Sequence, residues 1–263
     1  MKLSALKYIV IACIIAVATI VLNTFLGKGE TYSPRDYDEI ASSGVLRAVT
    51  EYSSISYHVV GDTVEGFDYE LLQAFASGKG LRLEITPEMS YEKRLLGVCS
   101  GQYDILACAT AITAQHRDSL LFTVPLNRSC LVLVQRTLEE QTDSLFIRNQ
   151  LSLAGLTIHI VKESPSRLRL RNIMNEIADT IYIEEIEYYG SEQLLAMVSA
   201  GDIDYAVCDQ TTASSLIDKF PNLDIGTEIG FTQLYAWAVN KKSVALLDSL
   251  NSFLKEKLAE DAM

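Results

Sequence analysis

The sequence predicts an α/β protein in which helices alternate with the strands of mostly parallel sheets. Two observations support this prediction: helical and strand patterns alternate regularly over Gly66–Phe122, and part of that segment recurs one hundred residues further along. Strands and helices that alternate at this spacing build parallel strands joined by right-handed crossovers. Ligands bind such sheets beyond the carboxyl ends of the strands, so a site is expected in the loops that follow them.

Apolar periodicity predicts each element of this segment. Apolar residues recur at every fourth position over 67–75, which is the pattern of one helix face. Alternating apolar and charged residues at 81–85 predict a strand, and a second helical stripe over 91–98 ends at Gly101. The apolar run at 105–109 is typical of a short buried strand.

The same two patterns cover the rest of the chain. A short helix at 37–43 and a strand at 45–50 are expected before the segment. The elements expected after it are a strand at 130–134, a polar helical stretch at 139–150, a strand at 156–161, a helix at 167–177, a strand at 181–186, a helix at 191–200, a strand at 205–208, a helix at 212–220, a strand at 235–239 and a closing helix at 244–258.

One helix–turn–strand unit is repeated. Leu95, Val98, Gly101, Asp104 and Cys108 recur as Leu195, Val198, Gly201, Asp204 and Cys208. The repeat indicates either a duplicated half or convergence on a common unit, and the residues alone leave both open.

Charge and motifs exclude several classes of function. The net charge is −12, with no basic patch, so nucleic-acid binding is not expected. The chain has no nucleophile elbow, P-loop or HExxH motif and no credible triad, so we expect no enzymatic activity.

Neither metal nor cofactor binding is expected. The three histidines show no metal-ligand spacing. The cysteines beyond residue 29 have no CxxC spacing, and free thiols are expected. These are Cys99, Cys108, Cys130 and Cys208.

The first 29 residues differ in kind from the rest. Lys2 and Lys7 precede an uncharged, largely apolar stretch from Tyr8 to Leu26, which indicates a signal peptide or a membrane anchor. Its length favours the anchor, since about 20 residues span a bilayer. A lipoprotein box ending at Cys13 is the less favoured alternative, because few apolar residues precede it and the apolar run continues after it. In each case the remainder is expected outside the cytoplasm.

A set of motifs in a fixed order identifies a family resemblance. The motifs are YSSISY at 52–57, GFDYELLQAFA at 66–76, SGQYDILACA at 100–109, TAQHRDSLLFTVP at 113–125 and GDIDYAVCDQ at 201–210. Together they resemble the family 3 extracellular solute-binding proteins, the periplasmic amino-acid receptors of ABC importers. The chain is also similar to the binding-protein-like N-terminal domain of membrane-bound lytic transglycosylase F. The resemblance covers about Val45 to Leu258.

The resemblance implies a two-lobed, periplasmic-binding-protein-like clamp of type II that holds its ligand between the lobes. Lobe 1 would be 30–126 plus 235–263, and lobe 2 would be 131–230. The family's ligand-sandwiching aromatic residues would be Tyr52 and Tyr91, and its ammonium-binding carboxylate would be Asp209.

The chain departs from the family pattern at the carboxylate-binding arginine. The family places this arginine three residues after the position of Thr113, which here is His116, and Arg117 comes one place later. One place on a helix is a rotation of about 100°, so Arg117 is expected to point elsewhere. Free amino-acid binding is therefore in doubt, whereas amino-acid-containing cell-wall fragments remain plausible ligands. The candidate ligand-binding residues are Tyr52, Tyr91, Thr110, Ala111, His116, Arg117, Ser164 and Asp209.

The expected function is ligand binding at the outer face of the inner membrane. The chain would be a periplasmic solute-binding protein, tethered through its N-terminal segment. It would bind an amino-acid-like or small peptide ligand and serve either an ABC transporter permease or cell-wall sensing. The alternatives are a non-catalytic regulatory or interaction domain, related to transglycosylase F, that has lost its ligand, and a subunit acting with a separate lytic enzyme.

Overall fold

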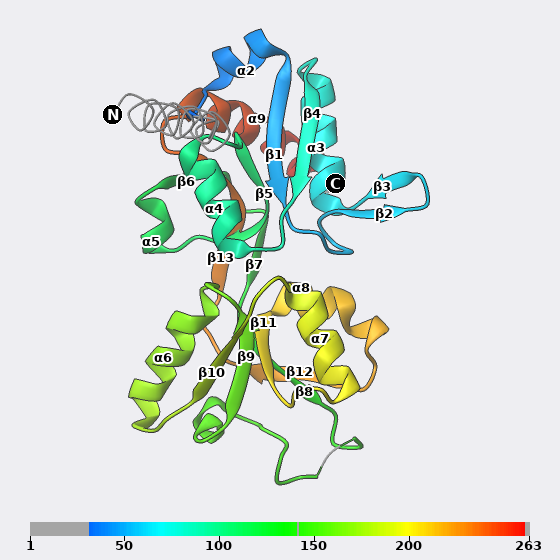
Figure 1. Ribbon diagram of the computed structural model, residues 1–263, viewed down its shortest axis with the longest axis vertical. Helices are drawn as coiled ribbons and strands as arrows, with labels where there is room; N and C mark the ends of the chain where they lie inside the picture. Colours follow the sequence, from blue (N-terminus) through cyan, green and yellow to red (C-terminus); the bar gives the residue numbers. More distant parts are fainter. Residues whose placement is uncertain (1–31, 141, 261–263) are drawn as a thin grey trace, which may run out of the picture. The chain divides into compact units, whose positions relative to one another are not determined.

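The computed structural model describes residues 32–140 and 142–260, which are drawn in colour in Figure 1. The expected signal or anchor, residues 1–29, lies outside the described residues. The account below concerns the compact unit Pro34–Met263. Within the described part of the chain, no helix combines the length and apolar character that crossing a bilayer requires.

The first sheet joins strands from the start and the end of this unit. Its strands are β1 (Val45–Thr50), β4 (Arg82–Pro87), β5 (Ile105–Ala111), β6 (Leu120–Phe122), β7 (Asn127–Ser129) and β13 (Gln233–Asn240). The helices in contact with it are α2 (Tyr37–Ser43), α3 (Phe67–Gly78), α4 (Tyr91–Ser100), α5 (Ala114–Arg117) and α9 (Val244–Glu260). The hydrogen-bonded order is β4-β1-β5-β13-β6, with β7 beside β13. The β1 strand runs parallel to β4 and β5, and β13 runs antiparallel to β5 and β6.

The second sheet is built from the middle of the chain. Its strands are β8 (Leu131–Arg136), β9 (Thr157–Val161), β10 (Tyr182–Ile186), β11 (Ala206–Asp209) and β12 (Leu223–Glu228). Its helices are α6 (Ser166–Ile177), α7 (Ser191–Ala200) and α8 (Gln210–Leu216). The order is β10-β9-β11-β8-β12, in which β9 runs parallel to β10 and β11, and β8 runs antiparallel to β11 and β12.

The two sheets share one plan. Strands β4, β1, β5, β13 and β6 correspond in position and direction to β10, β9, β11, β8 and β12. The repeated glycines also match, because Gly101 ends α4 and Gly201 ends α7, both in the left-handed conformation, with φ values of 85° and 82°. This shared topology favours duplication over convergence and confirms the expected α/β fold.

Each sheet has its own hydrophobic core on both faces. Leu72 and Leu250 pack on one face of the first sheet, and Val98 packs on the other. In the second sheet, Leu195 and Leu170 belong to separate clusters of the same kind. We call the residues around the first sheet lobe 1 and those around the second sheet lobe 2. The exact lobe boundaries stay a prediction.

Side chains of the two lobes meet across the space between the sheets. Ser54 of lobe 1 donates from its backbone N and its Oγ to the two carboxylate oxygens of Glu192 in lobe 2, at 3.0 Å each. Lys219 pairs with the same carboxylate at 3.0 Å. Ile55 packs against the core of lobe 2. These contacts join the lobes in a closed arrangement.

One expected element is wrong. The described residues of the stretch, 139–140 and 142–150, form turns and irregular backbone instead of a helix, and a 3-10 turn, Gln150–Leu153, follows them. Its backbone has a different partner, because the buried Gln135 side chain accepts from Ile147 N at 2.8 Å and donates to Ile147 O at 2.7 Å. A side chain from β8 thus replaces the hydrogen bonds that a helix would make.

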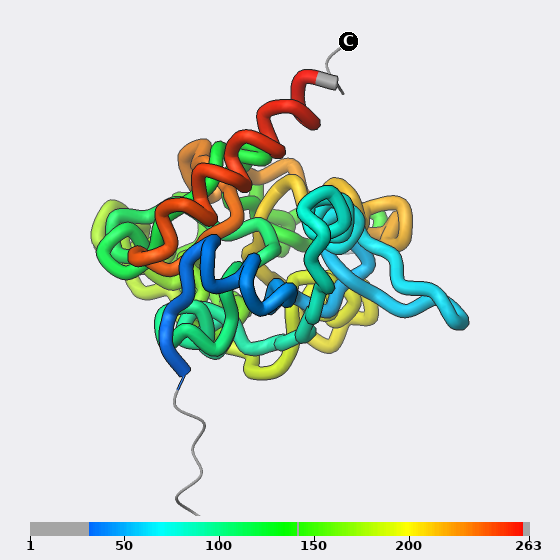
Figure 2. Tube along the Cα trace, turned by 90° about the horizontal axis from the view of Figure 1, so that it is seen from above, coloured from blue at the N-terminus to red at the C-terminus, as the bar shows by residue number. Residues whose placement is uncertain are grey.

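Several strands were not expected. β12 carries a bulge between Asp224 and Thr227, and the short strands β6 and β7 both pair with β13. A hairpin formed by β2 (His58–Val60) and β3 (Thr63–Glu65) projects from lobe 1 in Figures 1 and 2.

Candidate functional site

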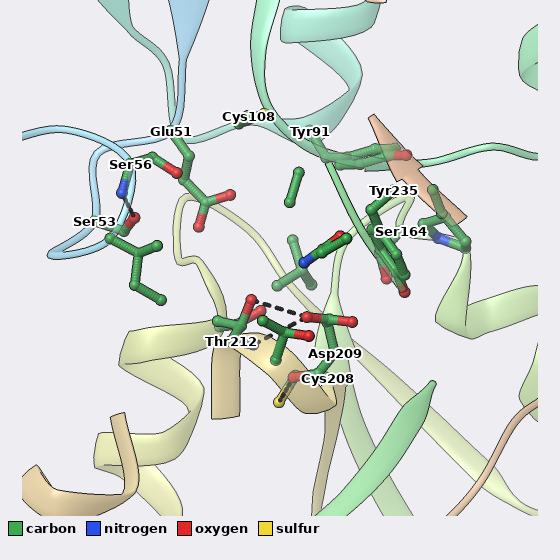
Figure 3. Close-up of a pocket in the computed structure, with 18 of the residues that line it drawn as sticks. Glu51, Ser53, Ser56, Tyr91, Cys108, Ser164, Cys208, Asp209, Thr212 and Tyr235 are labelled. Atoms are coloured by element: carbon green, nitrogen blue, oxygen red, sulfur yellow. Dashed lines mark hydrogen bonds between the residues drawn. The ribbon is translucent and has the colours of Figure 1, made fainter. Parts of the chain in front are cut away.

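A cavity of about 460 Å³ lies between the two lobes. This volume is typical of a small-molecule site. Figure 3 shows Glu51 reaching toward its centre from lobe 1, and Asp209 and Thr212 approaching from lobe 2. Polar side chains from both sheets therefore face the same cavity.

The carboxyl ends of the strands supply most of these side chains. Glu51 directly follows β1, Ala111 ends β5 and Asp209 ends β11. Ser164 comes from the loop between β9 and α6, and Tyr91 begins α4 just after β4. Because both sheets turn their carboxyl ends toward the cavity, the two lobes present their binding loops to the same ligand position.

Asp209 caps a helix with one carboxylate oxygen and leaves the other without a hydrogen-bond partner in the described residues. Its Oδ1 caps α8 by accepting from Thr212 N at 2.9 Å and from Thr212 Oγ1 at 3.2 Å. Its Oδ2 is buried and has no hydrogen-bond partner among the described residues. Burial raises the pKa of Tyr235 most, and the charge of the neighbouring Asp209 and the polar contact of the phenol with that carboxylate raise it further, so the phenol stays protonated.

Three further buried polar atoms of the cavity wall have no hydrogen-bond partner within 32–140 and 142–260. They are Tyr91 OH, Asn127 Oδ1 and Ser164 Oγ. A buried polar atom left unpaired costs about 1–3 kcal/mol, so native structures usually satisfy such atoms. Their gathering in one cavity, two from lobe 1 and one from lobe 2, indicates that a bound molecule completes their hydrogen bonds.

The wall also contains an internal ion pair. Arg94 is 3% exposed and donates to Glu51 Oε2 at 2.9 Å. It also donates to the carbonyls of Glu88 at 2.7 Å and Met89 at 3.1 Å. Burial disfavours the charge of Arg94, but Glu51 and the other acidic groups around it together outweigh burial and raise its pKa, so the guanidinium stays charged.

The cavity brings together half of the candidate residues from the sequence. Tyr91, Ala111, Ser164 and Asp209 lie in its wall. Their part in ligand binding stays a prediction.

The other candidate residues lie outside the cavity wall as described. Tyr52 is 42% exposed and stacks edge-on against Tyr57 at 6.3 Å. Thr110 is buried and donates to Cys108 O at 3.1 Å. His116 Nδ1 bonds to Ala111 O at 3.1 Å, and its ring lies 6.0 Å from the Tyr91 ring.

Arg117 is exposed at the end of the short helix α5, as the one-residue displacement predicted. No guanidinium therefore reaches the cavity from this loop within the described residues.

Sequence reasoning missed Glu51, Arg94, Asn127 and Tyr235. Arg94 follows Tyr91 by three positions and so shares its helix face, which was a usable signal. Glu51 stands directly at a strand end, beside the Tyr52 that was chosen instead. Adjacent residues leave a strand on opposite sides, so a choice between them needs the backbone direction.

Asp68 gives the wall a group sensitive to pH. It is 4% exposed and accepts from Trp237 Nε1 at 2.6 Å. Burial raises its pKa from 3.8 to about 6. Because the folded-state pKa lies above the unfolded value, this carboxyl favours folding fully below about pH 4, and that contribution is lost as pH rises through 6.

We therefore expect Asp68→Asn, which keeps an acceptor for the indole, to gain stability over the wild type as pH rises. The gain in free energy of unfolding should approach about 3 kcal/mol between pH 4 and pH 7, at about 1.4 kcal/mol per pKa unit. Urea denaturation across this range measures it. A difference that does not change with pH would show that Asp68 does not titrate there.

Metal binding has no candidate cluster in the described residues. No group of three His, Cys, Asp or Glu side chains there is arranged to hold an ion. Cys99, Cys108, Cys130 and Cys208 are free. Burial raises the pKa of Cys108 to about 12, so it remains a thiol.

Comparison with known proteins identifies the family to which this chain belongs. The family model for bacterial extracellular solute-binding proteins, family 3, matches residues 46–263. The chain belongs to this family.

Solved structures show that the fold of this solute-binding chain is the two-lobed clamp that the sequence predicted. The arginine-bound form of truncated ArgBP from T. maritima has a TM-score of 0.72 at 22% identity, over 84% of this chain and 99% of that one. An amino acid ABC transporter substrate-binding protein from Streptococcus pneumoniae, bound to L-arginine, has a TM-score of 0.71 at 20% identity, over 86% and 93%.

The curated relatives that match this solute-binding chain carry the names of enzymes. The membrane-bound lytic murein transglycosylase F of Ectopseudomonas mendocina is 26% identical over 255 residues, which are 95% of this chain and 50% of the relative. That of Photobacterium profundum is 27% identical over 225 residues, or 86% and 42%. The chain thus spans about half the length of the curated relatives it matches, or somewhat less.

Proposed function

We propose that this chain is an exported receptor that closes on a single amino-acid-like or small peptide ligand and has no catalytic activity of its own. The observation that supports the proposal is the cavity between the lobes, toward which unpaired buried polar atoms from both lobes turn. A ligand that bonds to both lobes favours the closed arrangement by its differential contacts.

Four residues are proposed to contact the ligand directly. Asp209 Oδ2 would accept from a ligand amine, Ser164 Oγ and Tyr91 OH would bond to neighbouring polar atoms, and Ala111 would line the floor. A direct contact is not proposed for Tyr52, Thr110, His116 or Arg117, because they lie outside the wall. His116 would instead support the Tyr91 ring beside it.

The proposed place of action is the periplasmic face of the inner membrane, with the apolar stretch from Tyr8 to Leu26 as the tether. Two roles fit such a receptor: delivery of the ligand to an ABC permease, or sensing for cell-wall metabolism. The names of the curated relatives favour the second role. Peptide fragments of murein are then the ligands to test first.

Thermal unfolding of the full chain with amino acids and murein peptides tests the proposal. A ligand at one hundred times its Kd should add about 2.7 kcal/mol to the free energy of unfolding, because it binds only the folded state. Absence of any shift across both libraries would contradict a receptor.

Asp209→Asn separates binding from folding. Asparagine caps a helix about as well as aspartate, so the α8 cap should survive while the charge-assisted bond to a ligand amine is lost. We expect affinity to fall at least tenfold with little change in the melting temperature. Asp218→Asn, which removes an exposed charge of the same lobe, is the matched control. Equal affinities of the two variants would exclude Asp209 from the site.

One alternative has an observation in its favour. The chain matches only part of its transglycosylase-named relatives, so a regulatory domain that has lost its ligand is the second candidate. Exposed Glu163, which takes a left-handed conformation at φ 59° beside Ser164, would repel an anionic ligand. Co-purification of the chain with a murein-cleaving enzyme, together with silent ligand screens, would favour this alternative.

A further inference from the structure

The one cation in the described cavity wall is already neutralised by the protein. The charged residues of the wall are Glu51, Asp68, Arg94 and Asp209. Arg94 donates to Glu51 Oε2 at 2.9 Å and spends its Nη1 on two backbone carbonyls. A ligand carboxylate would have to displace the Glu51 carboxylate to reach this guanidinium.

The other carboxylate oxygen of Glu51 points away from Arg94, toward lobe 2. This oxygen, Oε1, lies so close to Gly190, at the start of α7, that a Cβ on residue 190 would approach within 2.2 Å of it. Glu51 thus spans from the buried arginine of lobe 1 to a helix start in lobe 2. The space between Arg94 and the start of α7, where an anion would be attracted, is therefore occupied by the Glu51 carboxylate.

The groups that remain open favour hydrogen-bond donors. Asp209 Oδ2 and Asn127 Oδ1 can only accept, whereas Ser164 Oγ and Tyr91 OH can accept or donate. With Glu51 and Arg94 cancelling each other, Asp209 leaves a negative charge in the wall, and Asp68 adds a second one above its pKa of about 6. This combination attracts an amine and repels a free carboxylate beside it.

We propose that Glu51 supplies internally the carboxylate that an amino-acid ligand would otherwise bring, so that the cavity selects molecules with an amine but no carboxylate on the adjacent carbon. Amino-acid amides and the amino-terminal ends of peptides belong to this class. The inference rests on the proposed function, since it assumes that the cavity binds a small ligand.

The test compares ligands that differ only in this carboxylate. The probes are the twenty L-amino acids and their α-carboxamides, titrated calorimetrically against the full chain. The tightest-binding amide should bind at least tenfold more tightly than its own acid. An acid that binds as tightly as its amide would overturn the inference and leave the proposed receptor function intact. Binding of neither series would overturn the inference, and a silent murein-peptide screen would then remove the receptor function as well.

Glu51→Gln tests the residue itself. This variant leaves Arg94 without a partner carboxylate, so the acid should gain at least tenfold in affinity and the preference for the amide should disappear or invert. Glu92→Gln, an exposed position in the first turn of α4 with the same change of charge, should retain the wild-type preference. An unchanged amide preference in Glu51→Gln would overturn the assignment. The wild-type ratio of acid to amide affinity tests the class of ligand even if this variant does not fold.

Discussion

Arg94→Met should lower the free energy of unfolding by about 3 kcal/mol, because breaking a buried ion pair leaves one charge without its partner. Arg94 is 3% exposed, and its removal leaves the Glu51 carboxylate, whose side chain is 22% exposed, against apolar surroundings. The carbonyls of Glu88 and Met89 lose their donor at the same time. For a unit of this size, the melting temperature should fall by roughly 6–12 °C.

The double variant Glu51→Gln/Arg94→Met is the control for this prediction. With both charges gone, about 1–2 kcal/mol of the loss should be recovered, and the remaining cost of about 1–2 kcal/mol should reflect the two carbonyls that lose their donor. Urea denaturation of the wild type, both single variants and the double variant completes the cycle. If the double variant is as unstable as Arg94→Met, the charge left behind is not the cause of the loss.

Asp104→Asn should cost about 2–3 kcal/mol, because Asp104 joins three donors in the interior of lobe 1. Its fully buried side chain pairs with Arg35 at 2.5 Å and Arg47 at 2.8 Å, and it accepts from the Arg47 backbone N at 2.8 Å. An amide in this place would turn a donor toward a guanidinium and lose both charged bonds.

The internal repeat provides the matched control. Asp204 holds the equivalent place in lobe 2, but its side chain is 66% exposed and pairs with Arg136 alone among the salt bridges of the described residues. Exposed pairs contribute about 0–1 kcal/mol, so Asp204→Asn should stay within that range. Chemical denaturation of both variants compares them directly. Equal costs at the two positions would mean that burial does not set the strength of these pairs.

Local patterns predicted the elements whose side chains follow one period. The helix stripe of Phe67, Leu71 and Phe75 and the run at 105–109 depend on residues a few positions apart, and α3 and β5 formed there. The stretch 139–150 has no such dominant period, and the backbone of Ile147 is bound by the side chain of Gln135, a residue of the preceding strand. Contacts of this kind cannot be recognised from a window of neighbouring residues.

The candidate site divides in the same way. Ser164 and Asp209 were proposed because the family resemblance places its second-lobe helix start and its ammonium-binding carboxylate at these positions, near the strand ends where parallel sheets bind ligands. The displacement of Arg117 was also visible, since one residue on a helix changes the direction of a side chain by about 100°. Glu51 and Arg94 were missed, because their meeting depends on how α4 packs against β1 within lobe 1.

The order of apolar and polar residues was enough to determine the α/β class and the strand ends where a site had to lie, because these follow from the periods of helices and strands. The pairing of Glu51 with Arg94 and the unpaired oxygen of Asp209 were decided by packing within each lobe, and the approach of Glu51 to Gly190 only when the two lobes came together. Charge neutralisation acts through space over a few ångströms, whatever the separation along the chain. The chemistry that the cavity accepts is therefore a property of the folded arrangement.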